Sequence, residues 1–380
     1  MRILHTSDWH VGRTLRGRSR LDEQRAVLAE IAGAAADHRV DLVLIAGDLF
    51  DQASPGPEAE ELVYRVLLDL AAVAPVVIVA GNHDHPSRLR AVAPLLELGR
   101  VIVGSHLRRP EEGGVAEVRV ASGTARIAMV PFLSKRFVVK AADLMELDAD
   151  QHSGAYAGRV AAILGSLTQG LSGEQVNVVL AHLMVAGGLL GGGEREAHTV
   201  FDYVVPAQAF PGSLNYVALG HLHRQQRVPA SAPVWYSGSP LQLDFGETGD
   251  QKGVLVVEAE PGLPARVERV RLEAGRSLKV IRGTLLDIES LAGSTGDAYV
   301  RIELQEPPRA GLAEEVREMF PNAVDVALAP PQTDMDPDLH PPRLGRPPHD
   351  LFREYLVERG IDDEHVLELF DRLMEEADAP

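Results

Sequence analysis

Residues 3 to 13, which read ILHTSDWHVGR, set the pattern for the amino-terminal half of the chain. The first part of this stretch is an apolar run of the kind that forms a buried strand, and the potential ligands Asp8 and His10 follow it directly. The next two apolar runs also end in polar residues, at Gly47-Asp48 and at Gly81-Asn82-His83-Asp84. This recurrence indicates a functional site along one edge of a sheet.

Segments with helical periodicity separate these apolar runs. Strands are predicted at 2–6, 41–46 and 76–80, and helices at 20–37, 57–72 and 86–98. An alternation of strands and helices implies parallel strands joined by right-handed helical connections, which is the α/β fold class. In open α/β sheets ligands bind outside the carboxyl ends of the strands, where Asp8, Asp48 and Asn82 are expected.

Two more predicted strands end at histidines. The strand at 176–181 is followed by His182, and the strand at 216–219 is followed by Gly220-His221-Leu222-His223. Other strands are predicted at 115–120 and 125–131, with a helix at 154–171. Strands at 234–237, 253–258 and 265–272 are interpreted as antiparallel strands that close a second sheet.

Four parts are predicted along the chain. A main domain covers 1–275, and a small α+β capping domain covers 276–330. Residues 331–348 contain many prolines, which is typical of a linker. Two amphipathic helices are expected in 349–380.

Composition limits the chemistry of the site. The 380 residues include no cysteine, so disulfides, thiolate nucleophiles, cysteine-bound zinc and iron–sulfur clusters are excluded. The net charge is −18, which argues against a protein that coats DNA through bulk charge. Neither a secretory signal nor a membrane span is recognised in the sequence, so a cytoplasmic location is expected.

The candidate ligands are histidine, aspartate and asparagine side chains, a set that suits manganese, iron or zinc better than calcium. Asp48, which follows the middle one of the first three predicted strands, is the candidate for a carboxylate that bridges two ions. Each group taken singly has an alternative interpretation as a turn or a structural histidine. Five groups in this order, each after an apolar strand, favour a binuclear centre.

These blocks resemble the calcineurin-like metallophosphoesterase family, whose D-x-H, G-D-x-x-D, G-N-H-D/E, H and G-H-x-H motifs all occur here. The resemblance implies a four-layer αββα sandwich with a binuclear metal centre. It implies that one divalent metal ion, manganese with zinc or iron as alternatives, is bound by Asp8, His10, Asp48 and His223. The second ion would be bound by Asp48, Asn82, His182 and His221.

The resemblance assigns chemical roles to two further residues. His83 would face the scissile phosphate as a general acid or charge stabiliser, and Asp51 would orient the His83 ring. The metal ions would polarise the phosphoryl oxygens and activate the attacking water.

Flanking residues favour one substrate class. Phosphoprotein phosphatases carry arginines beside the G-D-x-x-D and G-N-H blocks, where this chain has Gln52 and Ala80. Residues 3–13 and Gly238-Ser239-Pro240 instead resemble the nuclease subunits of bacterial complexes that process DNA ends and hairpins. That resemblance implies a double-strand exonuclease and single-strand or hairpin endonuclease in DNA repair, recombination and replication. Its implied partner is an SMC-like ATPase, in an assembly with two copies of each subunit.

Several arginines follow the ligand motifs and are interpreted as a positive rim that attracts DNA. The candidates for DNA contact are Arg13, Arg16, Arg18, Arg20 and Arg88. Solvated surface positions are the alternative interpretation.

Each of the two carboxyl-terminal helices carries an apolar stripe, which we interpret as a docking face for the ATPase. The candidate contacts are Leu351, Phe352, Tyr355, Leu356, Leu369 and Phe370. Packing of the same stripe onto the chain's own body is the alternative.

Two other functions stay open at this point. One is a nucleotide or cyclic-nucleotide phosphodiesterase on the same scaffold, and the other is a non-catalytic interaction module. A phosphodiesterase for nucleotides does not account for the docking helices. A non-catalytic module does not account for five complete ligand motifs.

Overall fold

The fold is taken from a computed structural model, which describes residues 1–134, 156–194, 203–328, 348–359 and 364–377. A first six-stranded sheet has the order β16-β15-β1-β4-β5-β6. Its strands are β1 (Arg2–Thr6), β4 (Leu42–Ile45), β5 (Val76–Val79), β6 (Val101–Gly104), β15 (Gly253–Glu258) and β16 (Arg266–Arg271). Strands β1, β4, β5 and β6 are parallel, as the alternation with helices predicts.

A second six-stranded sheet has the order β13-β14-β12-β9-β8-β7. Its strands are β7 (Val115–Val120), β8 (Gly123–Val130), β9 (Val176–His182), β12 (Tyr216–Gly220), β13 (Gln226–Val228) and β14 (Val234–Tyr236). The central strands β8, β9, β12 and β14 are parallel, and β7 and β13 are antiparallel edge strands.

The last three predicted strands do not close one sheet together, although β15 and β16 are antiparallel as predicted. Strand β14 lies parallel to β12 in the second sheet, whereas β15 pairs antiparallel with β1 and extends the first sheet. Strand β16 then pairs with β15. Five of the six residues of β15 are buried, which agrees with its position inside the first sheet, between β16 and β1.

The residues of each central strand alternate between two cores. In β4, Leu42 and Leu44 face the other sheet, whereas Val43 and Ile45 face the helices. Because both faces are covered, the strand is apolar throughout.

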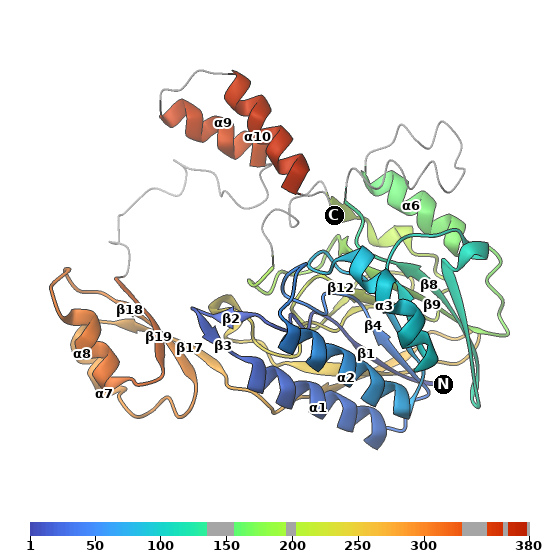
Figure 1. Cartoon of the computed structure of the whole chain (residues 1–380), viewed down its shortest axis with the longest axis horizontal. Helices are drawn as coiled ribbons and strands as arrows, with labels where there is room; N and C mark the ends of the chain where they lie inside the picture. Colours follow the sequence, from blue (N-terminus) through green and yellow to red (C-terminus); the bar gives the residue numbers. More distant parts are fainter. Residues whose placement is uncertain (135–155, 195–202, 329–347, 360–363, 378–380) are drawn as a thin grey trace.

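Helices cover the outer face of each sheet (Figure 1). Helices α1 (Leu21–Asp37), α2 (Pro57–Val73) and α3 (Pro86–Leu98) pack on the first sheet, and α6 (Tyr156–Leu167) packs on the second. The order of layers is therefore helix, sheet, sheet, helix. The predicted four-layer αββα sandwich is confirmed.

A third, three-stranded parallel sheet stands at one end of the molecule, beside the two large sheets (Figure 1). It consists of β17 (Leu278–Gly283), β18 (Tyr299–Leu304) and β19 (Ala323–Leu328), with helices α7 (Leu285–Ser290) and α8 (Leu312–Met319). It has its own apolar core, and a small cluster that includes Leu15, Phe245 and Tyr299 lies where it meets the sandwich. The domain boundaries at 275 and 330 stay a prediction.

Helices α9 (Pro348–Glu358) and α10 (Glu364–Ala377) form a hairpin (Figure 1). The rings of Phe352 and Phe370 stack with centroids 4.1 Å apart, and Asp371 accepts a hydrogen bond from His349 at 2.7 Å. The predicted linker lies outside the described residues except for Pro348. Within the described ranges, no helix is long and apolar enough to cross a bilayer.

Periodicity did not predict the shortest elements, because two or three residues carry too little pattern. These are β2 (Thr14–Leu15), β3 (Arg18–Ser19), β10 (Met184–Val185), β11 (Val204–Val205), β13, η1 (Pro110–Glu112), η4 (Ala207–Ala209) and η5 (Phe245–Glu247). The four-residue strand β6 was not predicted either.

Candidate metal centre

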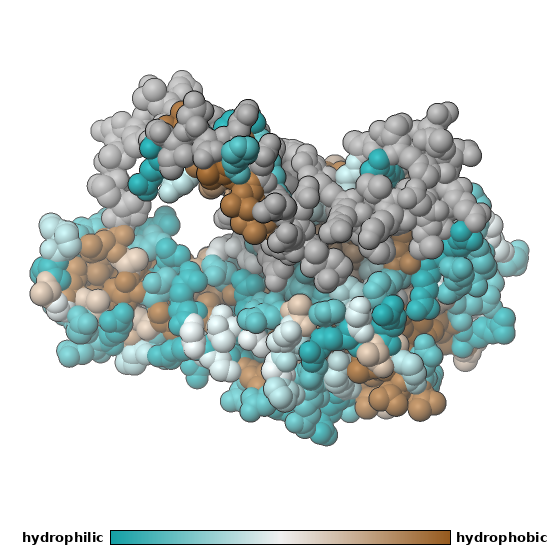
Figure 2. Space-filling model, turned by 45° about the horizontal axis from the view of Figure 1, so that its top comes forward, coloured by the Kyte–Doolittle hydropathy of each residue, from teal (hydrophilic) through white to brown (hydrophobic). Residues whose placement is uncertain are grey.

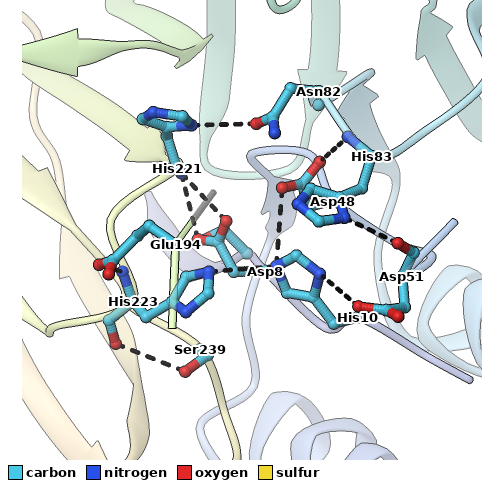
Figure 3. A network of polar contacts seen from close by, with 12 residues as sticks. Asp8, His10, Asp48, Asp51, Asn82, His83, Glu194, His221, His223 and Ser239 are labelled. Atoms are coloured by element: carbon cyan, nitrogen blue, oxygen red, sulfur yellow. Dashed lines mark hydrogen bonds and ion pairs between the residues drawn. The ribbon is translucent and has the colours of Figure 1, made fainter. Parts of the chain in front are cut away.

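The candidate ligands lie together because they follow adjacent parallel strands. Strands β1, β4 and β5 are neighbours in the first sheet, and β9 and β12 are neighbours in the second. The carboxyl ends of parallel strands meet at one edge, so the loops after all five strands converge (Figure 3). All seven predicted ligands reach this edge from the two sheets.

Asp48 lies at the middle of the cluster. Its Oδ2 atom is 3.6 Å from His10 Nε2 and 3.4 Å from His182 Nε2, so one oxygen faces a ring nitrogen from each half of the site. Its other oxygen accepts a hydrogen bond from the backbone N–H of His83 at 2.7 Å, which fixes the orientation of the carboxylate. Asp48 is therefore placed between the two halves of the site, where the predicted bridging carboxylate would be needed.

On one side of Asp48, three buried side chains form a compact group. Ligand atoms of Asp8, His10 and His223 lie within 4.8 Å of one another. The Nε2 atoms of the two histidines are only 3.1 Å apart. Two ring nitrogens that face each other beside a carboxylate suit a shared cation.

On the other side, the Oδ1 atom of Asn82 lies between two histidines. It is 2.8 Å from His182 Nε2 and 3.0 Å from His221 Nδ1. The Nδ1–H of His182 donates to the carbonyl of Ala46 at 2.7 Å, so in the neutral ring Nε2 carries the lone pair, and this atom faces Asn82 and Asp48. The donor set on this side is therefore two imidazoles, one amide oxygen and one carboxylate.

Four of the candidate ligands have positive φ angles, a region that residues other than glycine rarely adopt. The values are 53° for Asp8, 46° for His10, 53° for Asp48 and 105° for His221. Such strain persists only where the surroundings hold it, and it concentrates at functional sites. Here the loop of Asp8 and His10 donates backbone hydrogen bonds to the loop of Asp48.

Two motif glycines allow the loops to approach each other. A Cβ atom on Gly81 would lie 2.1 Å from Asp48 Oδ1, and one on Gly220 would lie 1.9 Å from the carbonyl oxygen of Ala46. Both distances are far inside van der Waals contact. The glycines before Asn82 and His221 are therefore needed for close packing around Asp48.

Burial and neighbouring charges shift the pKa values of the cluster. Burial raises the pKa of Asp8 to about 6. Burial alone would raise the pKa of Asp48 as well, but the imidazoles of His182 and His83 outweigh it and hold that pKa well below its usual value. Burial lowers the pKa of His182, whereas the Asp48 carboxylate more than offsets this and raises it to about 9. The cluster thus favours bound positive charge, and its chemistry fits a divalent metal ion.

His83 lies beside these candidate ligands, and Asp51 contacts its ring. The Nδ1–H of His83 donates to the backbone carbonyl of Asp51 at 2.7 Å. The Asp51 carboxylate instead lies 3.6 Å from His10 Nδ1 and 3.4 Å from Arg13. Asp51 therefore contacts the His83 ring through its backbone carbonyl, while its carboxylate faces His10 and Arg13.

The five arginines of the predicted rim are not equivalent. Arg13 reaches Asp51 and the carbonyl of Gly193, at the site itself. Arg16 pairs with Asp244 and Asp325, and Arg88 pairs with Glu60. Arg18 is exposed at the start of β3.

Arg20 does not lie on the rim. It is only 3% exposed, forms an ion pair with Glu23 at 2.8 Å, and donates to the carbonyls of Gln242 and Arg276. The prediction that it contacts DNA is corrected, because its guanidinium is enclosed and ties α1 to the segment near residue 242.

The predicted docking residues divide between the interior and the surface of the α9–α10 hairpin. Phe352 stacks on Phe370, and Leu356 is buried. Leu351 is half-buried, whereas Tyr355 is 47% and Leu369 is 43% exposed. Figure 2 shows apolar surface on this part of the molecule.

Sequence reasoning missed two acidic residues around His223. Glu194 accepts the backbone N–H of His223 at 3.0 Å, and Glu247 accepts its ring Nδ1–H at 2.9 Å. Neither belongs to a ligand motif. The Gly-rich loop at 187–193, which precedes Glu194, is the one sequence feature that could have pointed to this region.

A two-sheet α/β sandwich whose strand ends present aspartate, histidine and asparagine ligands defines a class of metal-dependent phosphoesterases. The calcineurin-like phosphoesterase family model matches residues 1–225, and the chain belongs to this family.

Within the family, the chain is similar to proteins named as the SbcD component of the nuclease SbcCD. It is 34% identical to the Bacillus subtilis protein over 343 residues, covering 86% of this chain and 85% of the relative. It is 36% identical to the Rhodobacter capsulatus protein, covering 82% and 78% of the two chains, and 32% identical to the Escherichia coli K12 protein, covering 81% and 76%.

Proposed function

We propose that this protein is a metal-dependent DNA nuclease with a binuclear centre, which acts with an SbcC-type ATPase. The observation that carries the proposal is the Asp48 carboxylate, one oxygen of which faces both His10 and His182. The names of the relatives supply the substrate class, since each is called a nuclease. The proposed setting is DNA end processing in repair, recombination and replication, in the cytoplasm.

In the proposed assignment, Asp8, His10, Asp48 and His223 bind one ion, and Asp48, Asn82, His182 and His221 bind the other. Two divalent ions there would neutralise charge on the phosphodiester and make a water molecule more acidic. We assign manganese, with zinc and iron as alternatives, because the ligands are imidazoles and oxygens without sulfur.

His83 is the proposed general acid. Its Nδ1–H donates to the Asp51 carbonyl at 2.7 Å, which directs Nε2 toward proton transfer at the leaving oxygen. Its ring lies edge-on to His10 with centroids 4.5 Å apart, which is within reach of a phosphate bound at the ligands.

Cleavage assays separate this proposal from its two alternatives. With Mn²⁺ and the SbcC-type partner, the protein should cut a labelled blunt duplex and a hairpin, and it should also cut a small chromogenic phosphodiester. Cleavage of the small diester without any DNA cleavage would favour a nucleotide phosphodiesterase. Cleavage of neither would favour a non-catalytic module.

The exposed arginines are proposed to attract the DNA backbone, and this gives a prediction. Changing both Arg18 and Arg88 to Ala should weaken duplex binding. It should also reduce the steepness of the plot of log association constant against log[salt] by about 2, because each phosphate contact contributes about 0.9 to that slope. Hydrolysis of the small diester should be unchanged. Arg119→Ala, which removes an exposed arginine on edge strand β7, is the matched control. A salt slope equal to that of the wild type would contradict the role of these arginines.

The α9–α10 hairpin is the proposed docking site for the ATPase. Replacing both Tyr355 and Leu369 by Glu should weaken binding of the SbcC-type subunit at least about tenfold, since buried apolar anchors dominate such interfaces. Pull-down with the purified subunit measures the loss, and Leu286→Glu on α7 is the control for an exposed leucine elsewhere. Binding as tight as wild type would contradict the assignment. An assembly with two copies of each subunit is part of the proposal.

A further inference from the structure

Glu247 is a carboxylate with no solvent exposure, and the proposed reaction gives it no role. It lies on the η5 turn and approaches His223 from the side opposite the metal cluster. We propose that Glu247 is a positioning residue that keeps the proton of His223 on Nδ1 and directs Nε2 to one metal site. This inference rests on the proposed function only in taking His223 as a metal ligand.

The two nitrogens of the His223 ring have different surroundings. Nδ1 lies 2.9 Å from Glu247 Oε1, whereas Nε2 lies 3.1 Å from His10 Nε2, in the same cluster as Asp8. A neutral imidazole carries one proton, and a carboxylate accepts but cannot donate a hydrogen bond when it is ionised. Glu247 therefore stabilises the tautomer whose lone pair is on Nε2, the one that can bind a cation.

Glu247 is itself held in place. Its Oε2 accepts from the ammonium of Lys252 at 2.7 Å and from the backbone N–H of Leu243 at 3.0 Å. Lys252 also donates to the backbone carbonyl of His223 at 3.0 Å and to Ser239 at 2.9 Å. The lysine thus compensates the buried charge of Glu247 and restricts its rotation.

The Gly-rich loop encloses this pair. A Cβ atom on Gly193 would lie 2.2 Å from Glu247 Oε1 and 2.8 Å from His223 Nδ1, so only a glycine fits over the hydrogen bond. Glu194 follows and accepts the backbone N–H of His223 at 3.0 Å. The ring and the backbone of His223 are therefore each held by a carboxylate, and the ring contact is buried.

The other half of the centre uses a different support. His182 donates its Nδ1–H to the Ala46 carbonyl, and this contact does not involve the η5 turn. Loss of Glu247 should therefore affect the site that contains His223 and spare the site that contains His182 and Asn82. This asymmetry distinguishes a positioning role from a general contribution to folding.

The test uses the full chain and two variants, Glu247→Gln and the double variant Glu247→Gln with Lys252→Met. In the single variant the buried ammonium of Lys252 loses its carboxylate partner, which could destabilise the fold. The double variant removes that ammonium as well, so it controls for misfolding. Glu303→Gln is the control, because Glu303 is also a buried ion-paired glutamate but lies on β18 of the third sheet. Metal affinity is measured by titration of the metal-free protein with Mn²⁺ and with Zn²⁺, and the His223 tautomer is read from ¹⁵N ring shifts assigned with His223→Gln.

In both Glu247 variants we expect one of the two metal sites to weaken about 10-fold to 100-fold while the other keeps its affinity. The ¹⁵N shifts should move from a protonated Nδ1 toward a mixture of tautomers. Unchanged affinity at both sites, or equal weakening of both with an unchanged tautomer, would overturn the proposal. Neither readout uses DNA, so a protein that binds metal as expected but cuts no DNA would refute the proposed function and leave this inference standing.

Discussion

Replacing Asp48 by Asn is expected to lower phosphodiester cleavage by about 10⁴-fold, because it removes the charge shared by both halves of the centre. Oδ2 of Asp48 is 3.6 Å from His10 Nε2 and 3.4 Å from His182 Nε2, so a single carboxylate oxygen faces both rings. Asn has nearly the same shape as Asp, and its side-chain oxygen can still accept a hydrogen bond from the backbone N–H of His83. The loss should therefore reflect charge rather than collapse of the loop.

Two measurements check this result. Metal analysis of the purified variant should find less than the two ions per chain expected for the wild type, and initial rates on the small diester should fall as stated. Asp69→Asn, an exposed position on α2, is the control for the same chemical change. Retention of both ions with a rate within tenfold of wild type would refute the bridging role.

Replacing His83 by Ala is expected to lower turnover about 10²-fold to 10⁴-fold and to leave the metal content unchanged. The geometry makes this test informative, because a ring nitrogen of His83 also lies within 4.8 Å of ligand atoms of His10 and Asp48. A metal ligand and a general acid are both compatible with that distance. Only the acid role predicts full metal occupancy after the ring is removed.

The leaving group separates these roles further. If His83 protonates the leaving oxygen, the defect should be much smaller for a diester with an acidic phenol as leaving group than for DNA, because such an oxygen needs no proton. His38→Ala, at the end of α1, is the control. Loss of metal from the His83 variant, or an equal defect on both substrates, would contradict the role of general acid.

The sequence anticipated the layers of the fold more reliably than the pairing of its strands. Alternation of apolar strands and amphipathic helices is a local property, so the strands and helices around Asp8, Asp48 and Asn82 were predicted close to their observed bounds. The partner of a strand is not local. Residues 253–258 were recognised as a strand, but their place beside β1 depends on which sheet edge is open after the remaining strands have packed.

The same distinction applies to individual side chains. Arg20 has the residue type of a DNA contact, yet the segment near Gln242, more than two hundred positions away, encloses it. Glu247 carries no motif, yet it contacts His223 because the η5 turn and the Gly-rich loop pack on the second sheet. Burial of a charged residue depends on its neighbours in space, which residue type and spacing do not specify.

The amino-acid order alone determined the set of candidate ligands at the strand ends, because the polar residues that follow an apolar strand are visible in a short window. Tertiary packing decided which atoms of these residues contact one another. It directs the carboxylate of Asp51 to His10 and its carbonyl to His83, and it gives His223 a carboxylate to hold its ring. Hydrogen bonds depend on distances of a few tenths of an ångström, and those are set only when segments remote in sequence pack together.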